Sequence, residues 1–189
     1  MSKRGAVFLD RDGTIIEDTG YVASAAEVRL LPGAAAAIAR LNAAGIAAVV
    51  VTNQSGIARG LLDEAAYAAT ACRLDDLLAA EGARLAAHYH CPHHPDFTGP
   101  CECRKPGLLL YRRAAEDHGL DLQGSWWVGD RIRDVLPAGR LGGRGVLIES
   151  QAGDRPAERP ADTDAHLLRA RDLRGAVDIV LRERARLPR

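Results

Sequence analysis

The sequence predicts an α/β fold, a doubly wound parallel sheet of the Rossmann type, from three observations. Short apolar segments without polar alternation recur along the chain, which is typical of parallel strands buried on both faces. Helical patterns separate these segments, as the crossover connections between parallel strands require. Several of the segments end at an acidic or hydroxyl residue, and open α/β sheets bind ligands beyond the carboxyl ends of their strands.

Four apolar segments are predicted to be strands. They span residues 6–9, 46–51, 85–89 and 126–128. The first ends at Asp10, the second at Thr52 and the fourth at Gly129-Asp130, whereas the third leads into a group of Cys and His residues. Because the carboxyl ends of parallel strands meet at one edge, we expect these polar residues to lie together.

Helices are predicted over residues 33–44, 63–81, 108–118 and 172–186. Gly45, Gly82 and Gly119 follow the first three, at the positions where helices commonly end. Asp63 is well placed as an N-cap for the second helix. Residues 153–164 are rich in Pro, Asp and Arg and are expected to form a surface loop.

The bulk composition indicates one domain over residues 1–189, with neither an internal repeat nor a dividing linker. The 25 basic and 25 acidic side chains balance, which argues against a nucleic-acid or anionic-membrane partner. The apolar run after the basic N-terminus stops at Leu9, too early for a signal peptide. We therefore expect a cytoplasmic protein, and a monomer because no long apolar stripe remains once the sheet is covered.

The segment Asp10-Arg11-Asp12-Gly13-Thr14 carries the strongest chemical signal. Two carboxylates one residue apart at a strand end can perform different tasks on one phosphorus atom. Asp10 is expected to attack as nucleophile, while Asp12 protonates the leaving oxygen and later activates water. Gly13 permits the sharp turn. The alternative is an Asx-rich turn that only caps the strand.

A second cluster contains three of the four cysteines, with histidines among them. Cys91, Cys101 and Cys103, with His93 or His94, offer a Cys₃His set that suits tetrahedral Zn²⁺ and leaves no open position, so the metal is expected to be structural. Free thiols in a loop are the alternative. Cys72 is expected to be a small core residue, and His88 and His90 ordinary packing or surface residues.

With these motifs in order, the chain resembles the haloacid dehalogenase superfamily over residues 6–148. The matching segments are Asp10–Thr14, Val51–Asn53, Arg104–Pro106, and Gly129–Arg131 with Asp134. The resemblance implies that Thr52 and Lys105 stabilise a transferring phosphoryl group. It implies Mg²⁺ bound by Asp10, Asp130 and the main-chain carbonyl of Asp12. Asp134 either assists the metal indirectly or orients its loop, and we favour the structural role.

The zinc cluster narrows the resemblance to D-glycero-D-manno-heptose 1,7-bisphosphate phosphatases, which carry a short zinc loop in place of a large cap. Their pattern, Cys-x-His and then Cys-x-Cys-Arg-Lys-Pro, stands here within residues 91–106. It makes residues 91–103 the zinc loop and His93, rather than His94, the fourth ligand. It also implies a set of substrate contacts: Asp18, Thr19, Gly20, Tyr21, Asn53, Gln54, Ser55, Arg104 and Arg131.

The family resemblance implies an activity as well. The expected enzyme is a Mg²⁺-dependent phosphatase that removes one phosphate from the heptose bisphosphate through an aspartyl-phosphate, during synthesis of nucleotide-activated heptose for surface polysaccharide. Histidinol phosphate and the phosphorylated end of a polynucleotide are alternative substrates within the same superfamily. A zinc-stabilised binding module is the non-enzymatic alternative, and the intact set of acids with Lys105 argues against it.

Overall fold

The computed structural model describes residues 4–149 and 167–186 and contains a single six-stranded sheet in which every strand pair is parallel. This arrangement confirms the predicted fold class. The strands are β1 (Ala6–Leu9), β2 (Ala47–Asn53), β3 (Ala87–Cys91), β4 (Trp126–Gly129), β5 (Arg144–Ile148) and β6 (Leu167–Ala170).

The strand order β3-β2-β1-β4-β5-β6 places the first strand in the middle of the sheet. The chain first builds outward from β1 to β3, then returns to the other side of β1 and builds outward to β6. The order therefore reverses between β1 and β4, which pair directly. In open α/β sheets this reversal creates a crevice at the carboxyl ends of the strands, where ligands bind.

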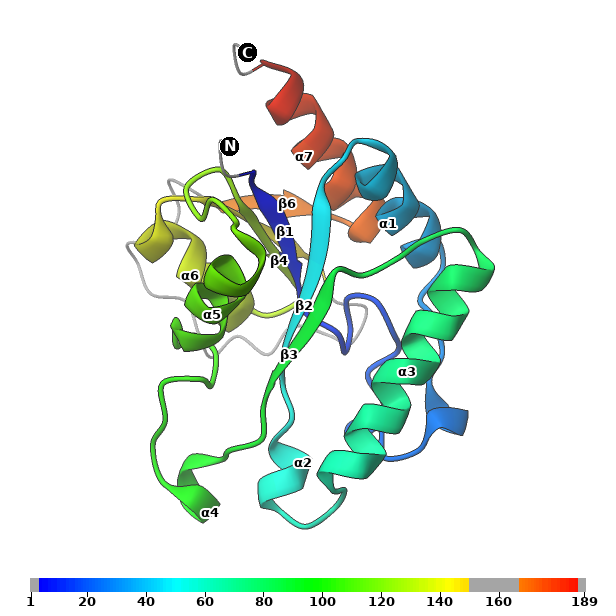
Figure 1. Ribbon diagram of the computed structural model, residues 1–189, viewed down its shortest axis with the longest axis vertical. Helices are drawn as coiled ribbons and strands as arrows, with labels where there is room; N and C mark the ends of the chain where they lie inside the picture. Colours follow the sequence, from blue (N-terminus) through cyan, green and yellow to red (C-terminus); the bar gives the residue numbers. More distant parts are fainter. Residues whose placement is uncertain (1–3, 150–166, 187–189) are drawn as a thin grey trace.

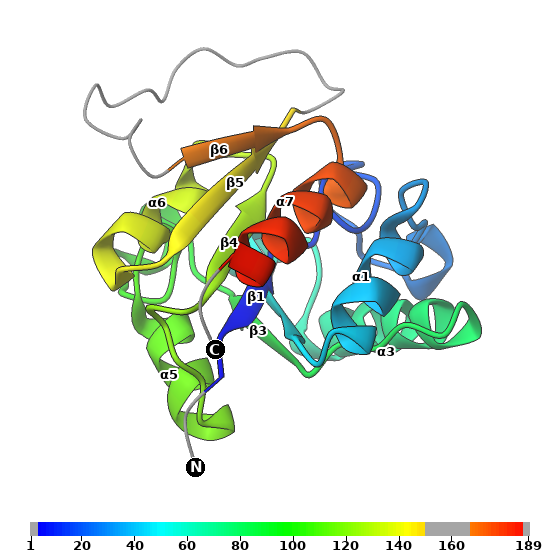
Figure 2. The same ribbon diagram turned by 90° about the horizontal axis from the view of Figure 1, so that it is seen from above.

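Helices cover both faces of the sheet. Figures 1 and 2 show α5 and α6 on one face and α1, α3 and α7 on the other. The longer helices are α1 (Ala34–Ala43), α3 (Glu64–Ala80), α5 (Leu109–His118), α6 (Ile132–Leu141) and α7 (Leu173–Arg186). Three short elements, η1 (Ala25–Glu27), α2 (Ser55–Ala58) and α4 (Pro95–Thr98), lie in the connections.

The core is divided by the sheet into two apolar layers, and β1 contributes to both. Val7 and Leu9 pack on the side of α1 and α7, whereas Ala6 and Phe8 pack on the side of α5 and α6. Since successive side chains of a strand point to opposite faces, a strand covered on both sides must be apolar throughout. This burial explains the unbroken apolar run that precedes Asp10.

All four predicted strands and all four predicted helices are present, each within two residues of the expected bounds. Asp63 caps α3 as expected, since its Oδ1 accepts a hydrogen bond from the Ala66 N–H at 2.7 Å. The prediction for Cys72 is wrong: its side chain is exposed on α3 rather than packed in the core. The surface loop predicted for residues 153–164 lies outside the described residues.

Three of the longer elements, α6, β5 and β6, were not predicted, and each has a local reason. Pro137 lies inside α6 and interrupts its helical pattern. β5 begins at the exposed Arg144, and β6 is an edge strand whose Leu168 and Arg169 are exposed, so neither is uniformly apolar. Among the described residues, no helix combines the length and the apolar content needed to cross a membrane.

Candidate active site

Two acidic residues meet where β1 and β4 end. Asp10 directly follows β1, and its N–H donates to the carbonyl of Val128 in β4 at 2.9 Å. Asp130 directly follows β4. Gly13 has φ +78°, and a Cβ atom there would lie 2.6 Å from Asp130 Oδ2, so the turn after Asp10 requires glycine on two counts.

Lys105 reaches Asp10 from the loop that precedes α5. Its Nζ lies 2.7 Å from Asp10 Oδ1, 2.7 Å from Asp134 Oδ1 and 2.8 Å from the carbonyl oxygen of Val51. The ammonium group donates hydrogen bonds to Asp10 and to the Val51 carbonyl, and it forms an ion pair with Asp134. Burial alone lowers the pKa of Lys105, but the charges of Asp10 and Asp134 outweigh it and hold the pKa above its usual value.

Three carboxylates gather beside Lys105, which forms ion pairs with two of them. Asp10, Asp130 and Asp134 each offer an oxygen, and these oxygens all lie within 4.8 Å of one another. Burial, together with the charges of Asp10 and Asp134, raises the pKa of Asp130 to about 7. Asp130 Oδ1 is buried without a hydrogen-bond partner. Excess negative charge and an unpartnered oxygen fit a hard divalent cation such as Mg²⁺.

Asp134 also orients the loop after β4. Its Oδ2 accepts a hydrogen bond from the Arg131 N–H at 3.0 Å, in the first turn of α6. The same carboxylate therefore restrains the loop, holds Lys105 and lies beside the other two acids. The sequence indicated the first of these roles, but the contact with Lys105 needs the folded chain.

The Asp12 carboxylate lies outside the group of three acids and faces Arg11 and Gln54 instead. Burial raises the pKa of Asp12, although Arg11 opposes the shift. A raised pKa suits a group that must donate a proton at neutral pH.

Thr52, which is 1% exposed, accepts a hydrogen bond from the Gln54 amide at 2.9 Å, so its own proton is free to donate.

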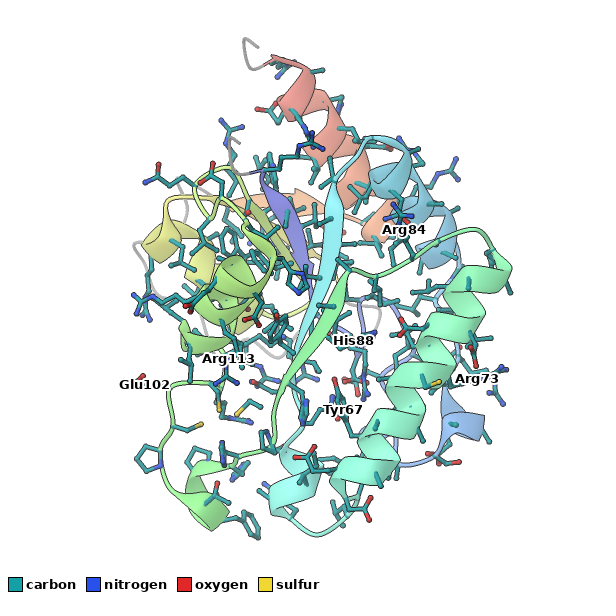
Figure 3. All side chains as sticks on the ribbon, viewed as in Figure 1. Tyr67, Arg73, Arg84, His88, Glu102 and Arg113 are labelled. Atoms are coloured by element: carbon teal, nitrogen blue, oxygen red, sulfur yellow. The ribbon has the colours of Figure 1, made fainter. Side chains whose placement is uncertain are left out.

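The predicted metal ligands of the loop after β3 also come together. Donor atoms of Cys91, His93, Cys101 and Cys103 all lie within 4.8 Å of one another. Figure 3 shows sulfur atoms gathered where this loop turns back toward α5. The three sulfurs are separated by 2.9–3.6 Å, and His93 Nδ1 lies 3.2 Å from Cys103 Sγ. Thiolates this close repel one another unless a cation lies between them, so the donor set fits Zn²⁺.

His88, His90 and His94 have other partners. His94 caps α4, because its Nδ1 accepts a hydrogen bond from the Asp96 N–H at 3.3 Å. His88 pairs with Asp75 at 2.9 Å and His90 with Glu64 at 2.8 Å, both across the contact between β3 and α3. Figure 3 shows Tyr67 and His88 in this contact region. These pairs agree with the packing role expected for His88 and His90.

The expected substrate contacts divide into three groups. Asp18 and Arg131 pair with each other at 2.8 Å, which ties the loop after β1 to the loop after β4. Asp18 Oδ1 also accepts a hydrogen bond from the Gly20 N–H at 3.0 Å, and Tyr21 is 44% exposed. Together with the exposed Thr19, these residues form a surface that is accessible to a ligand.

The second group of expected substrate contacts is Asn53, Gln54 and Ser55, which follow Thr52. The Asn53 side chain accepts a hydrogen bond from the Lys105 N–H at 2.9 Å and donates to the Lys105 carbonyl at 3.3 Å. Gln54 is 6% exposed, and Ser55 begins α2. Asn53 therefore fixes the backbone of Lys105 across the end of the sheet.

The third group is cationic and consists of Arg104. Arg133, which the sequence did not single out, lies near it. Arg104 Nη1 donates to the His93 carbonyl at 3.2 Å, and its pKa is lowered by burial and then by the nearby charge of Arg133. Among the described residues, neither arginine forms a salt bridge with a carboxylate. Two unpaired arginines near one another indicate a place for an anion.

Comparisons with known proteins agree with this geometry. A family model described as HAD-hydrolase-like matches residues 102–176. The D-glycero-beta-D-manno-heptose-1,7-bisphosphate 7-phosphatase of Pseudomonas aeruginosa is 40% identical over 158 residues, which cover 83% of this chain and 88% of that protein. A D-glycero-D-manno-heptose-1,7-bisphosphate 7-phosphatase of Thermosynechococcus vestitus is 41% identical over 164 residues, or 82% and 84% of the two chains.

A solved structure matches nearly the whole fold. The D,D-heptose 1,7-bisphosphate phosphatase of B. bronchiseptica, complexed with magnesium and phosphate, superposes with a TM-score of 0.84 at 36% identity and covers 95% of this chain and 99% of its own. The parallel sheet and the strand-end acids around Lys105 thus define a hydrolase of the haloacid dehalogenase class. Within that class, the chain belongs to the heptose-1,7-bisphosphate 7-phosphatase family.

Proposed function

We propose that this protein hydrolyses the 7-phosphate of D-glycero-D-manno-heptose 1,7-bisphosphate through a phosphoryl group carried on Asp10. The observation that carries the proposal is the contact of Lys105 Nζ with Asp10 Oδ1 at 2.7 Å, beside Asp130 and Asp134. Relatives at about 40% identity bear this activity in their names. The proposal includes the role in heptose synthesis and the cytoplasmic, monomeric state expected from the sequence.

The proposed reaction proceeds in two displacements. An oxygen of Asp10 attacks phosphorus, the bond to the sugar oxygen breaks, and that oxygen takes the proton of Asp12. Asp12 then accepts a proton from water, whose oxygen attacks phosphorus and releases Asp10 and inorganic phosphate. Lys105 neutralises Asp10 and, with the free proton of Thr52, stabilises charge on the phosphoryl oxygens.

Mg²⁺ is the proposed catalytic metal, with Asp10 and Asp130 and the main-chain carbonyl of Asp12 as its protein ligands. It supplies positive charge that offsets the repulsion between an anionic nucleophile and an anionic substrate. Asp134 lies among the same oxygens and is already engaged by Lys105. We therefore assign Asp134 to holding Lys105 and the loop.

The elevated pKa of Asp130 predicts that protons compete with Mg²⁺. The folded-state pKa of about 7 exceeds the ordinary value of 3.8, so the metal-free protein loses stability as pH rises through about 7. Bound Mg²⁺ offsets this loss, and at 100 times its Kd it adds about 2.7 kcal/mol at full affinity. Thermal unfolding should show a larger Mg²⁺-induced rise in Tm at about pH 8 than at about pH 5.5.

Asp130→Asn is the matched variant for this measurement. It removes the titrating group, so the rise in Tm with Mg²⁺ should be small and nearly the same at both pH values. Equal Mg²⁺-induced shifts at both pH values in the unmodified protein would contradict a proton at Asp130 that competes with the metal.

Zn²⁺ bound by Cys91, His93, Cys101 and Cys103 is proposed as a structural metal. The loop that holds these ligands runs directly into Arg104 and Lys105. A fixed loop therefore fixes the two cations that follow it. Burial raises the pKa of the Cys91 thiol, so in the absence of a metal this sulfur retains its proton.

A second phosphate on the substrate gives the arginines a function. Lys105 Nζ contacts Asp10, Asp134 and the Val51 carbonyl. We assign it to stabilising the phosphate that is transferred. Arg104, with Arg133 near it, is proposed to bind the phosphate that remains on the sugar. Arg131, paired with Asp18, and the exposed Tyr21 are proposed to contact the sugar.

Comparison of three substrates tests the proposed specificity. We expect kcat/KM for the heptose bisphosphate to exceed the values for histidinol phosphate and a 3′-phosphorylated oligonucleotide by about 10²-fold or more. Histidinol phosphate has one phosphate, and the other phosphates of the oligonucleotide are diesters, so neither offers Arg104 a second phosphate monoester. Release of inorganic phosphate with Mg²⁺ present provides the measurement. Equal or faster turnover of either rival would refute the substrate assignment and leave the phosphatase chemistry in place.

A further inference from the structure

Both oxygens of the Asp12 carboxylate are held by neighbouring side chains. Arg11 donates to Oδ1 from Nη2 at 2.9 Å, and its Nε lies 3.1 Å from Oδ1 and 3.2 Å from Oδ2. Gln54 donates to Oδ2 from Nε2 at 2.9 Å. The carboxylate is thus restrained by one residue from the loop after β1 and by one from the end of β2.

Arg11 and Gln54 are restrained in turn. Arg11 Nη2 donates to Gln54 Oε1 at 3.2 Å, which closes a ring of hydrogen bonds with Asp12. Arg11 Nη1 donates to Thr70 Oγ1 on α3 at 3.1 Å, and the Thr70 hydroxyl donates to the Tyr67 carbonyl at 2.7 Å. The guanidinium also lies over the Tyr67 ring, 5.5 Å from its centroid.

Burying these polar side chains has a cost in desolvation free energy, which suggests that the arrangement serves the function of the site. Arg11 is 1% exposed and Gln54 6% exposed, so both have given up hydration. A buried ion pair contributes little stability compared with apolar residues of the same shape. What it provides is a fixed geometry, and a carboxylate that must meet the leaving oxygen of a substrate needs fixed geometry to be an efficient acid.

We propose that Arg11 and Gln54 are positioning residues, which hold the Asp12 carboxyl where it protonates the leaving oxygen of the substrate. The inference rests on the proposed function and gives Gln54 this task in place of a substrate contact. In the step concerned, the bond from phosphorus to the sugar oxygen breaks, the bond from phosphorus to Asp10 forms, and the proton moves from Asp12 to the departing oxygen. Thr70 anchors Arg11 to α3.

The basicity of the leaving oxygen determines how strongly a substrate depends on this proton transfer. An alkyl phosphate such as the heptose 7-phosphate releases a strongly basic oxygen and needs the proton of Asp12. p-Nitrophenyl phosphate releases a weakly basic phenolate, which departs without one. Damage to the position of Asp12 therefore slows release from the alkyl ester and spares release from the aryl ester, whereas general damage to the site slows both.

Gln54→Met is the first test, because it keeps the length of the side chain and removes its hydrogen bonds to Asp12 and Arg11. It also removes the bond to Thr52, but Thr52 acts on the phosphoryl group, so that loss slows both esters alike. In single-turnover experiments with excess enzyme, we expect alcohol release from the heptose bisphosphate to slow about 10²-fold, with p-nitrophenol release changed by less than about 3-fold. KM for the bisphosphate should change little. Equal slowing of both esters, or a raised KM with an unchanged rate, would overturn the proposal.

Two further measurements keep the test decisive if Gln54→Met folds poorly. Thr70→Val removes the anchor of Arg11 and should reproduce the selective effect more weakly, while Thr70→Ser retains the hydroxyl and should restore the rate. In a double-mutant cycle, Gln54→Met should not increase the selective slowing of the alkyl ester beyond that of Asp12→Asn, because its effect on leaving-group departure acts through Asp12. Additive effects, or failure of Thr70→Ser to rescue the rate, would count against positioning.

Measurements on the wild-type protein distinguish a failure of this proposal from a failure of the proposed substrate assignment. If it turns over p-nitrophenyl phosphate but not the heptose bisphosphate, the substrate assignment fails. The same comparison then proceeds with glycerol 3-phosphate as the alkyl ester, and the selective loss expected for Gln54→Met is unchanged.

Discussion

Asp10→Asn is expected to lower kcat by about 10⁴-fold or more, because the amide cannot form the covalent phosphoryl intermediate. Rapid acid quenching of the wild-type enzyme with ³²P-labelled substrate should trap label on the protein, and peptide mapping should place it on Asp10. The variant should trap none. Its zinc content should equal that of the wild type, because Asp10 is not among the clustered metal-loop residues.

The Asp10→Asn variant is expected to remain folded. The amide oxygen can still accept the hydrogen bond of Lys105, and removal of one charge relieves the repulsion among the three clustered acids. Asp75→Asn, on α3 and paired only with His88 among the described residues, is the matched control and should keep full activity. A normal rate or a labelled protein in the Asp10 variant would refute the covalent mechanism.

Cys103→Ser is expected to have the largest effect on stability. Loss of one thiolate from a four-ligand site should release the zinc, and structural zinc binding contributes directly to folding free energy. We expect a loss of about 3 kcal/mol or more in unfolding free energy, measured by denaturant titration, with zinc content measured by mass spectrometry. Activity should fall as well, because Lys105 lies two residues after Cys103.

Cys72→Ser is the control for this experiment, since Cys72 is an exposed free cysteine on α3. Its zinc content, stability and activity should match those of the wild type. Full activity in Cys103→Ser protein without zinc would show that the loop positions Arg104 and Lys105 without a metal.

The sequence predicted those features that local patterns encode. Asp10 and Asp130 follow apolar strands, and the parallel topology implied by alternating strands and helices brings such strand ends to one edge. The cysteines were recognisable because metal ligands recur at short spacings. β6 escaped prediction because an exposed edge strand lacks the apolar run that marks a buried one.

Contacts between distant residues were beyond such patterns. Arg11 meets Gln54 and Thr70 at separations of 43 and 59 residues, and nothing in the local sequence of Thr70 indicates a partner for a buried guanidinium. The pairing of Lys105 with Asp134 likewise arises from how α6 and the loop before α5 pack. Side-chain networks of this kind depend on the tertiary structure, so the positions of the strands alone do not determine them.

The most direct measurement is a crystal structure of the protein grown with Mg²⁺ and beryllofluoride, which mimics a phosphoryl group on a carboxylate. We expect the adduct on Asp10, with Lys105, Thr52 and the metal around it and the Asp12 carboxyl facing its open side. An adduct on another residue, or one from which Lys105 and Asp12 both point away, would contradict the proposed mechanism.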